Sequence, residues 1–125
     1  MFMNDVARSV HSVLLDPCLN FAALTDKFGR VSLLDLDQFV IVRMWKGYRE
    51  AQCDWIRRPD SHSSLVIYAP YRGLLEIWDP FGSRIGAGNV GLECRLFGAR
   101  LQDGLSSCFL MTKTGEIYAI EIVLD

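Results

Sequence analysis

Apolar and polar residues alternate along this chain in three similar segments, each made of two short apolar runs joined by a turn that contains one glycine. The segments read FAALTDKFGRVSLLDL (21–36), SLVIYAPYRGLLEIWD (64–79) and SCFLMTKTGEIYAIEI (107–122). A period of two is typical of β-strands, and the runs are rich in the β-branched and aromatic residues that strands favour. Each segment is therefore predicted to form a β-hairpin.

The three turn glycines give the length of the repeat. Gly29, Gly73 and Gly115 are 44 and 42 residues apart, and each is expected to adopt the positive φ that closes a hairpin. A repeat of about 40–45 residues with about four strands per unit is typical of a β-propeller blade. A blade does not bury its faces alone, so the units are expected to stack on one another.

The repeat extends beyond the hairpins and predicts further strands. The first strand of each unit is predicted over 9–15, 51–57 and 93–97. The hairpins are predicted as 20–25 with 31–36, 64–69 with 74–79 and 107–112 with 116–123, and the outer strands as 39–45 and 84–88. Only the first dozen residues also fit a helix, through Val6, Val10, Val13 and Leu14.

These strands predict an all-β fold, a partial β-propeller of the WD-repeat type with about two and three-quarter four-stranded antiparallel blades. We expect one domain over 1–125, with blade-like units at about 9–46, 51–90 and 93–125. Natural propellers close with about four to eight blades. The segment is therefore expected to leave open blade faces, through which it could self-associate.

Composition and charge narrow the functional classes. The chain has 125 residues, 50% of them apolar and 22% charged, with a formal net charge of −2. This composition argues against disorder and against a nucleic-acid surface, which needs concentrated positive charge. No window is apolar enough to cross a bilayer, and the N-terminus lacks the apolar stretch of a signal peptide. The four cysteines form no CxxC pair and fit a reducing compartment, so we expect a cytoplasmic protein.

Two motifs offer chemistry, and neither has the context that the chemistry needs. Gly86, Gly88 and Gly91 form GxGxxG, which binds dinucleotides when a helix opens inside it. The following LECRLFGARL has weak helical periodicity, so a loop at a blade edge is the favoured interpretation and a nucleotide-binding enzyme the less favoured one. His62 lies in a polar loop without the spacing of a catalytic triad or a zinc site. We expect no catalytic residue, no cofactor and no metal.

The segment MWKGYREAQCDWI (44–56) is the strongest candidate for a functional surface. It concentrates aromatic and charged residues between the first two units, and Trp, Tyr and Arg are frequent anchors in protein interfaces. Trp45 and Trp55 are expected to fill the space between blades. Lys46, Tyr48 and Arg49 are predicted to form a protein interface.

The same segment carries a family resemblance. WKGYREAQCDWI and SLVIYAPYRGLLEIWDPFGSRIGAGNVGLECRL, together with LLDPCLNFAALTDKFGRVSLLDL and VIVRMWKGYR, resemble the N-terminal region of the regulatory, non-catalytic subunit of the Rab-three GTPase-activating protein. The resemblance runs from about residue 12 to residue 96. It implies a cytosolic subunit with an N-terminal β-propeller that binds a catalytic partner subunit.

The resemblance also implies a role in vesicle trafficking. In that family the complex accelerates GTP hydrolysis by Rab proteins and promotes nucleotide exchange on a Rab linked to the endoplasmic reticulum, where partners would hold this chain peripherally. The GTPase-activating arginine belongs to the catalytic subunit, so no arginine of this chain inherits that role. We therefore expect a non-enzymatic scaffold that acts by protein–protein binding. The alternative is a propeller-like interaction module unrelated to Rab proteins.

Overall fold

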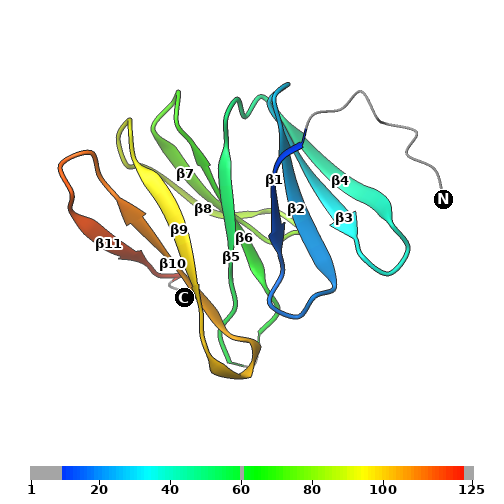
Figure 1. Cartoon of the computed structure of the whole chain (residues 1–125). Coiled ribbons are helices and arrows are strands. Elements are labelled where there is room, and N and C mark those ends of the chain that lie inside the picture. The colour runs from blue at the N-terminus through cyan, green and yellow to red at the C-terminus, as the bar shows by residue number, and fades with distance from the viewer. Residues whose placement is uncertain (1–9, 60, 123–125) are drawn as a thin grey trace.

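The structure is a computed structural model that describes residues 10–59 and 61–122. Within these residues the chain forms three antiparallel β-sheets that stand side by side (Figure 1). The first sheet holds β1 (Val10–Leu15), β2 (Phe21–Asp26), β3 (Arg30–Asp35) and β4 (Val40–Lys46). The second holds β5 (Gln52–Ile56), β6 (Ser64–Ala69), β7 (Leu74–Trp78) and β8 (Arg84–Asn89). The third holds β9 (Arg95–Arg100), β10 (Ser106–Met111) and β11 (Ile117–Ile120), with a short 3₁₀ helix, η1 (Gln102–Gly104), before β10.

Strands that follow one another along the chain are also neighbours in each sheet, as in propeller blades. The all-β fold and the two and three-quarter blades are confirmed. The strand predicted over 9–15 is present as β1. The alternative of a helix is wrong for Val10, Val13 and Leu14, which lie in β1, and residues 1–9 lie outside the described residues. The third sheet departs from the prediction, because β9 runs on to Arg100 and β11 ends at Ile120.

The sheets pack on each other through two apolar cores. Strand β6 serves both, since all six of its residues are buried and successive side chains point to opposite faces. Leu65 and Ile67 face the first sheet, whereas Val66 and Tyr68 face the third. The first core consists of Ala23, Val31, Leu33, Trp45, Ala51, Cys53, Trp55, Leu65 and Ile67. The second consists of Ile56, Val66, Tyr68, Cys94, Leu96, Cys108, Leu110 and Ile122.

The turn glycines have the predicted conformation. Gly29, Gly73 and Gly115 have φ values of 82°, 62° and 90°, which favour glycine over other residues. Gly73 also lies against the loop that leads from β8 to β9. A Cβ atom added to it would lie 2.9 Å from the carbonyl carbon of Gly91. The repeat therefore places a glycine where the turn needs both a left-handed backbone and a close approach of two chain segments.

Both outer faces of the three-sheet stack carry exposed apolar side chains of described residues. In β1, Leu14 packs toward the first core, so its neighbours Val13 and Leu15 point away from the second sheet, and both are exposed. In the third sheet, Phe97 and Phe109 pair across neighbouring strands on the face opposite Leu110, with ring centroids 5.5 Å apart. In a propeller, faces of this kind pack against neighbouring blades.

Candidate protein-interaction surface

Three connections meet at one edge of the first two sheets, the upper one in Figure 1. They are the β2–β3 turn (26–30), the β4–β5 loop (46–51) and the β6–β7 turn (70–73). We call this surface the upper ridge. The amide of Tyr48 donates a 2.8 Å hydrogen bond to the carbonyl of Gly29, which joins the first turn to the loop. The guanidinium of Arg72 donates a 3.1 Å bond to the carbonyl of Gly47, which joins the loop to the second turn.

Tyr48 anchors the upper ridge to the interior. Its hydroxyl donates a 2.6 Å hydrogen bond to Oε1 of Glu76 on β7, and the guanidinium of Arg72 lies 4.9 Å from its ring centroid. Burial, together with the hydrogen bond to the Glu76 carboxylate and its charge, raises the pKa of Tyr48 to about 12. The hydroxyl therefore stays protonated at neutral pH and remains a donor.

Glu76 has a second partner. Its side chain is buried, and Oε2 accepts a 2.7 Å bond from Arg84 on β8. Burial by itself would raise the pKa of this carboxyl, but the hydrogen bonds from Tyr48 and Arg84 and the charge of Arg84 place the pKa below its ordinary value. A charged carboxylate thus sits between the first two sheets with both oxygens bonded.

Arg49 and Tyr71 form an exposed cation–aromatic pair on the upper ridge. The guanidinium of Arg49 lies 5.3 Å from the centroid of the Tyr71 ring, and this ring is 61% exposed. The Tyr71 hydroxyl donates a 2.5 Å hydrogen bond to Oε2 of Glu50. Glu50 has a φ of 52°, a conformation that a residue other than glycine seldom adopts. The bond to Tyr71 therefore restrains the Tyr71 ring.

A second exposed ring lies on the neighbouring turn. Phe28 is 61% exposed, with the Lys27 amino group 5.6 Å and the Arg30 guanidinium 5.3 Å from its ring centroid. The carboxylate of Asp26, in the same turn, is buried. It accepts hydrogen bonds from the amide of Phe28 and from the Arg30 guanidinium. The exposed side of the turn is therefore aromatic and basic.

The structure separates the three residues that the sequence predicted as an interface. Lys46, the last residue of β4, and Arg49 are exposed on the upper ridge, whereas Tyr48 is half-buried between the first two sheets. That these residues bind a partner remains a prediction. Sequence reasoning did not find Tyr71 or Arg72, which lie on another repeat. The signal that could have found them is the repeat itself, because it places successive turns next to each other.

The tryptophans lie where they were predicted. Trp45 and Trp55 are 6% and 1% exposed in the core between the first two sheets. The Trp55 indole donates a 2.8 Å hydrogen bond to the carbonyl of Leu14. Trp45 packs edge-on against Trp78, and the Arg43 guanidinium lies 4.6 Å and 5.1 Å from the two rings. These side chains hold the two sheets together beneath the upper ridge.

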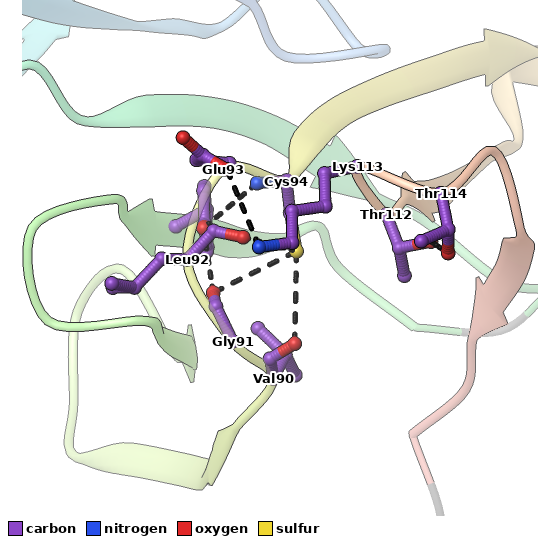
Figure 2. A network of polar contacts seen from close by, with 9 residues as sticks. Val90, Gly91, Leu92, Glu93, Cys94, Thr112, Lys113 and Thr114 are labelled. Atoms are coloured by element: carbon purple, nitrogen blue, oxygen red, sulfur yellow. Dashed lines mark hydrogen bonds and ion pairs between the residues drawn. The ribbon is translucent and has the colours of Figure 1, made fainter.

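The GxGxxG segment is not a phosphate-binding loop. Gly86 and Gly88 lie in the outer strand β8, and the loop after it leads into strand β9 instead of the helix that dinucleotide binding requires. Figure 2 shows that the loop is closed by its own contacts, since the Cys94 thiol lies 3.6 Å from the carbonyl oxygens of Val90 and Gly91. The nucleotide-binding alternative therefore lacks its structural basis.

Asp35 and the sequence candidate His62 have ordinary structural roles. Oδ1 of Asp35 accepts hydrogen bonds from the amides of Asp37 and Gln38, as in a turn. His62 is exposed, 3.6 Å from Oδ1 of Asp79. Within residues 10–59 and 61–122, no group of three His, Cys, Asp or Glu side chains is placed to hold a metal ion.

The three stacked sheets define a segment of a β-propeller with an aromatic and basic loop surface. The chain is similar in structure to the WD40 domain of SCAP from fission yeast, with a TM-score of 0.61 and 12% sequence identity. The match covers 90% of this chain and 29% of the SCAP chain. At that identity the likeness establishes the fold.

The family follows from sequence. The sequence model described as Rab3 GTPase-activating protein regulatory subunit N-terminus matches residues 1–97. The Rab3 GTPase-activating protein regulatory subunit of Caenorhabditis elegans is 33% identical over 94 residues, which cover 71% of this chain and 7% of that protein. The chain belongs to the family of the N-terminal region of Rab3 GTPase-activating protein regulatory subunits, and it spans about 7% of the length of the curated relative.

Proposed function

We propose that this chain is a non-catalytic scaffold segment of a Rab-regulating complex and that it binds the catalytic subunit through the upper ridge. One observation supports the proposal most: the loop that carries Lys46 and Arg49 lies inside the family match at residues 1–97 and projects both side chains into solvent. Exposed Arg and Tyr side chains on a rigid frame are what protein interfaces use as anchors.

The scaffold would act by holding its contact residues in one geometry. Tyr48, Glu76 and Arg84 join the loop to two strands of the second sheet, so the loop moves with the sheet beneath it. A rigid surface loses less conformational entropy on binding than a mobile one. The complex would then stimulate GTP hydrolysis, and nucleotide exchange, on Rab proteins, with the catalytic groups supplied by the other subunit.

The proposed location is the cytoplasm, with peripheral attachment at the endoplasmic reticulum through partners. In the part of the chain that the structure describes, no helix has the length and apolar character needed to cross a membrane.

Capture of the purified catalytic subunit by the immobilised chain tests the proposal. The test variant is the double substitution Lys46→Ala and Arg49→Ala, which leaves the Tyr48–Glu76 bond in place. The matched control is Arg95→Ala with Lys113→Ala, which removes two exposed cations from the third sheet. We expect capture to fall about tenfold for the test variant and less than twofold for the control. Equal capture by all three proteins would overturn the proposed contact.

The alternative of an interaction module unrelated to Rab proteins gives a different result in an activity assay. Rab GTP hydrolysis is measured with the complete complex and with a complex whose regulatory subunit lacks this segment. A change in rate supports the Rab-regulating role. An unchanged rate, with nucleotide exchange also unchanged, supports the alternative.

A further inference from the structure

We propose that the upper ridge recognises an acidic segment of a protein partner. The proposal rests on the proposed function above and adds the chemistry of the partner. The charged side chains of the upper ridge differ in whether they have partners within this chain. Asp26 is bonded to Arg30 and Glu50 to Tyr71, so both carboxylates of the ridge have a partner within this chain. Glu76, which lies beneath the ridge on β7, is bonded to Tyr48 and Arg84.

Most cations of the upper ridge, in contrast, have no carboxylate partner in the part of the chain that the structure describes. Among the described residues, Lys27, Lys46 and Arg49 have no carboxylate within ion-pair distance, and all three are exposed. Arg72 is occupied by the Gly47 carbonyl and the Tyr48 ring. The ridge therefore presents unpaired positive charge around carboxylates that are already bonded. The complementary surface on a partner is negative.

Two aromatic rings are positioned among these cations. Phe28 lies beside Lys27 and Arg30, and Tyr71 lies beside Arg49. Ring faces and aliphatic stems next to cations suit a peptide that alternates acidic and apolar side chains. The rings are also held in place, Tyr71 by the hydrogen bond to Glu50 and the Phe28 turn by the Asp26 bonds, which lowers the entropic cost of binding.

A peptide fits these features better than an anionic membrane. Inserting Tyr71 into lipid would draw the charged Glu50 toward the bilayer with it, because the two are hydrogen-bonded. Three unpaired cations also fall short of the about four to eight that basic membrane-binding clusters use. A peptide needs no insertion and can accept all three cations with separate carboxylates.

The experiment measures binding of the full chain to three probes. The first is a short fluorescein-labelled peptide in which glutamate and aspartate alternate with apolar residues, one of them tryptophan. The second is its glutamine and asparagine counterpart, and the third is vesicles of phosphatidylserine and phosphatidylcholine. The test variant is Lys27→Glu with Arg49→Glu. The control is Arg95→Glu with Lys113→Glu. It makes the same change in net charge at the upper edge of the third sheet.

We expect the acidic peptide alone to bind, with an affinity that falls as salt rises from about 50 to 300 mM. The test variant should bind it at least tenfold more weakly, a change of about 1.4 kcal/mol, and the control within twofold of the unchanged protein. Equal binding of the neutral peptide, binding of the vesicles alone, or an equal loss in both variants would overturn the inference. Circular dichroism and the urea midpoint establish that both variants are folded.

The result is separable from that of the proposed function. Capture of the catalytic subunit is measured on the same two variants. If capture falls in the test variant while the acidic peptide does not bind, the interface stands and its acidic chemistry is wrong. If the acidic peptide binds as expected and capture is unchanged, the ridge recognises acidic segments but the proposed partner is wrong.

Discussion

The hydroxyl of Tyr48 donates a 2.6 Å hydrogen bond to Oε1 of Glu76, and this bond ties the loop after the first sheet to strand β7 of the second. The other Glu76 oxygen accepts from Arg84 on β8. Three side chains from two blades thus form one chain of charge-assisted hydrogen bonds, which are stronger than neutral ones. Because the ridge loop carries one of them, the stability of the blade pair and the geometry of the proposed interface are coupled.

Replacing Tyr48 by Phe tests that coupling. The change removes the hydroxyl, keeps the ring and leaves one oxygen of a buried carboxylate without its donor. We expect the free energy of unfolding in urea to fall by about 1.5–3 kcal/mol, the usual cost for a hydrogen bond to a charged group. Tyr71→Phe is the matched control. It removes an exposed hydroxyl and should change stability by at most about 0.5 kcal/mol. Equal effects of the two changes would contradict this role of Tyr48.

Substituting Glu76 by Gln should alter how stability depends on pH. The pKa of Glu76 is lowered in the folded protein, so its charge stabilises the fold above the unfolded pKa of about 4.3 and the stabilisation is lost as pH falls further. The pKa of Asp26 is lowered too, but Asp26 is present in both proteins and cancels. Urea denaturation from pH 7 to pH 3 should therefore show a difference between the two proteins that is constant down to about pH 5 and shrinks below about pH 4. A difference that grows with acidity would mean that the sign of the pKa shift is wrong.

The strands were predictable because their signal is local. Alternating residues and a turn glycine lie within each hairpin, and three copies of the pattern reinforce one another. The third sheet shows the limit of this signal. Gly98 to Arg100 have weak strand character, yet they pair with Ser106 to Cys108 of β10, so the partner strand decides their structure. Ile122 was predicted as strand, but the ladder ends where Ile120 pairs with Cys108.

The candidate site was only partly predictable, for a related reason. Arg49 and Lys46 were found from the composition of one loop, but Tyr71 and Arg72 join them through the stacking of two blades. That stacking sets which turn meets which loop. The composition of a single loop does not contain this information, and only the spacing of the repeat indicates it. The same stacking draws Tyr48 inward, where Glu76 supplies a partner 28 residues further along the chain.

Gly73 should not tolerate a side chain. Its φ is 62°, and a Cβ atom would lie 2.9 Å from the backbone carbon of Gly91, which cannot rotate away as a side chain could. We expect Gly73→Ala to lower the free energy of unfolding by about 1–3 kcal/mol. Gly88→Ala is the control, because nothing lies within 4 Å of the added atom and its φ is not in the left-handed region. It should change stability by at most about 0.5 kcal/mol. If Gly88→Ala destabilises the protein as much as Gly73→Ala does, the contact with Gly91 and the positive φ of Gly73 do not explain the loss of stability.

The two uncovered faces predict that the chain by itself self-associates. Val13 on the first sheet and Ile117 on the third are 55% and 59% exposed, on faces that a propeller buries against neighbouring blades. We expect sedimentation equilibrium to give a mass above that of the 14.2 kDa monomer, increasing with concentration. The double substitution Val13→Lys with Ile117→Lys should restore the monomer, because a charge at the centre of such a contact would have to be desolvated.

The control for self-association is Leu19→Lys with Leu92→Lys, which adds the same charge at two exposed leucines in connections between strands. This protein should associate as the unchanged chain does. If it becomes monomeric as well, the effect comes from net charge and the blade faces are not the contact. If the unchanged chain is a monomer throughout, the faces are stable in water without a partner. The open ends of the stack would then be compatible with the free segment, and the predicted self-association would be wrong.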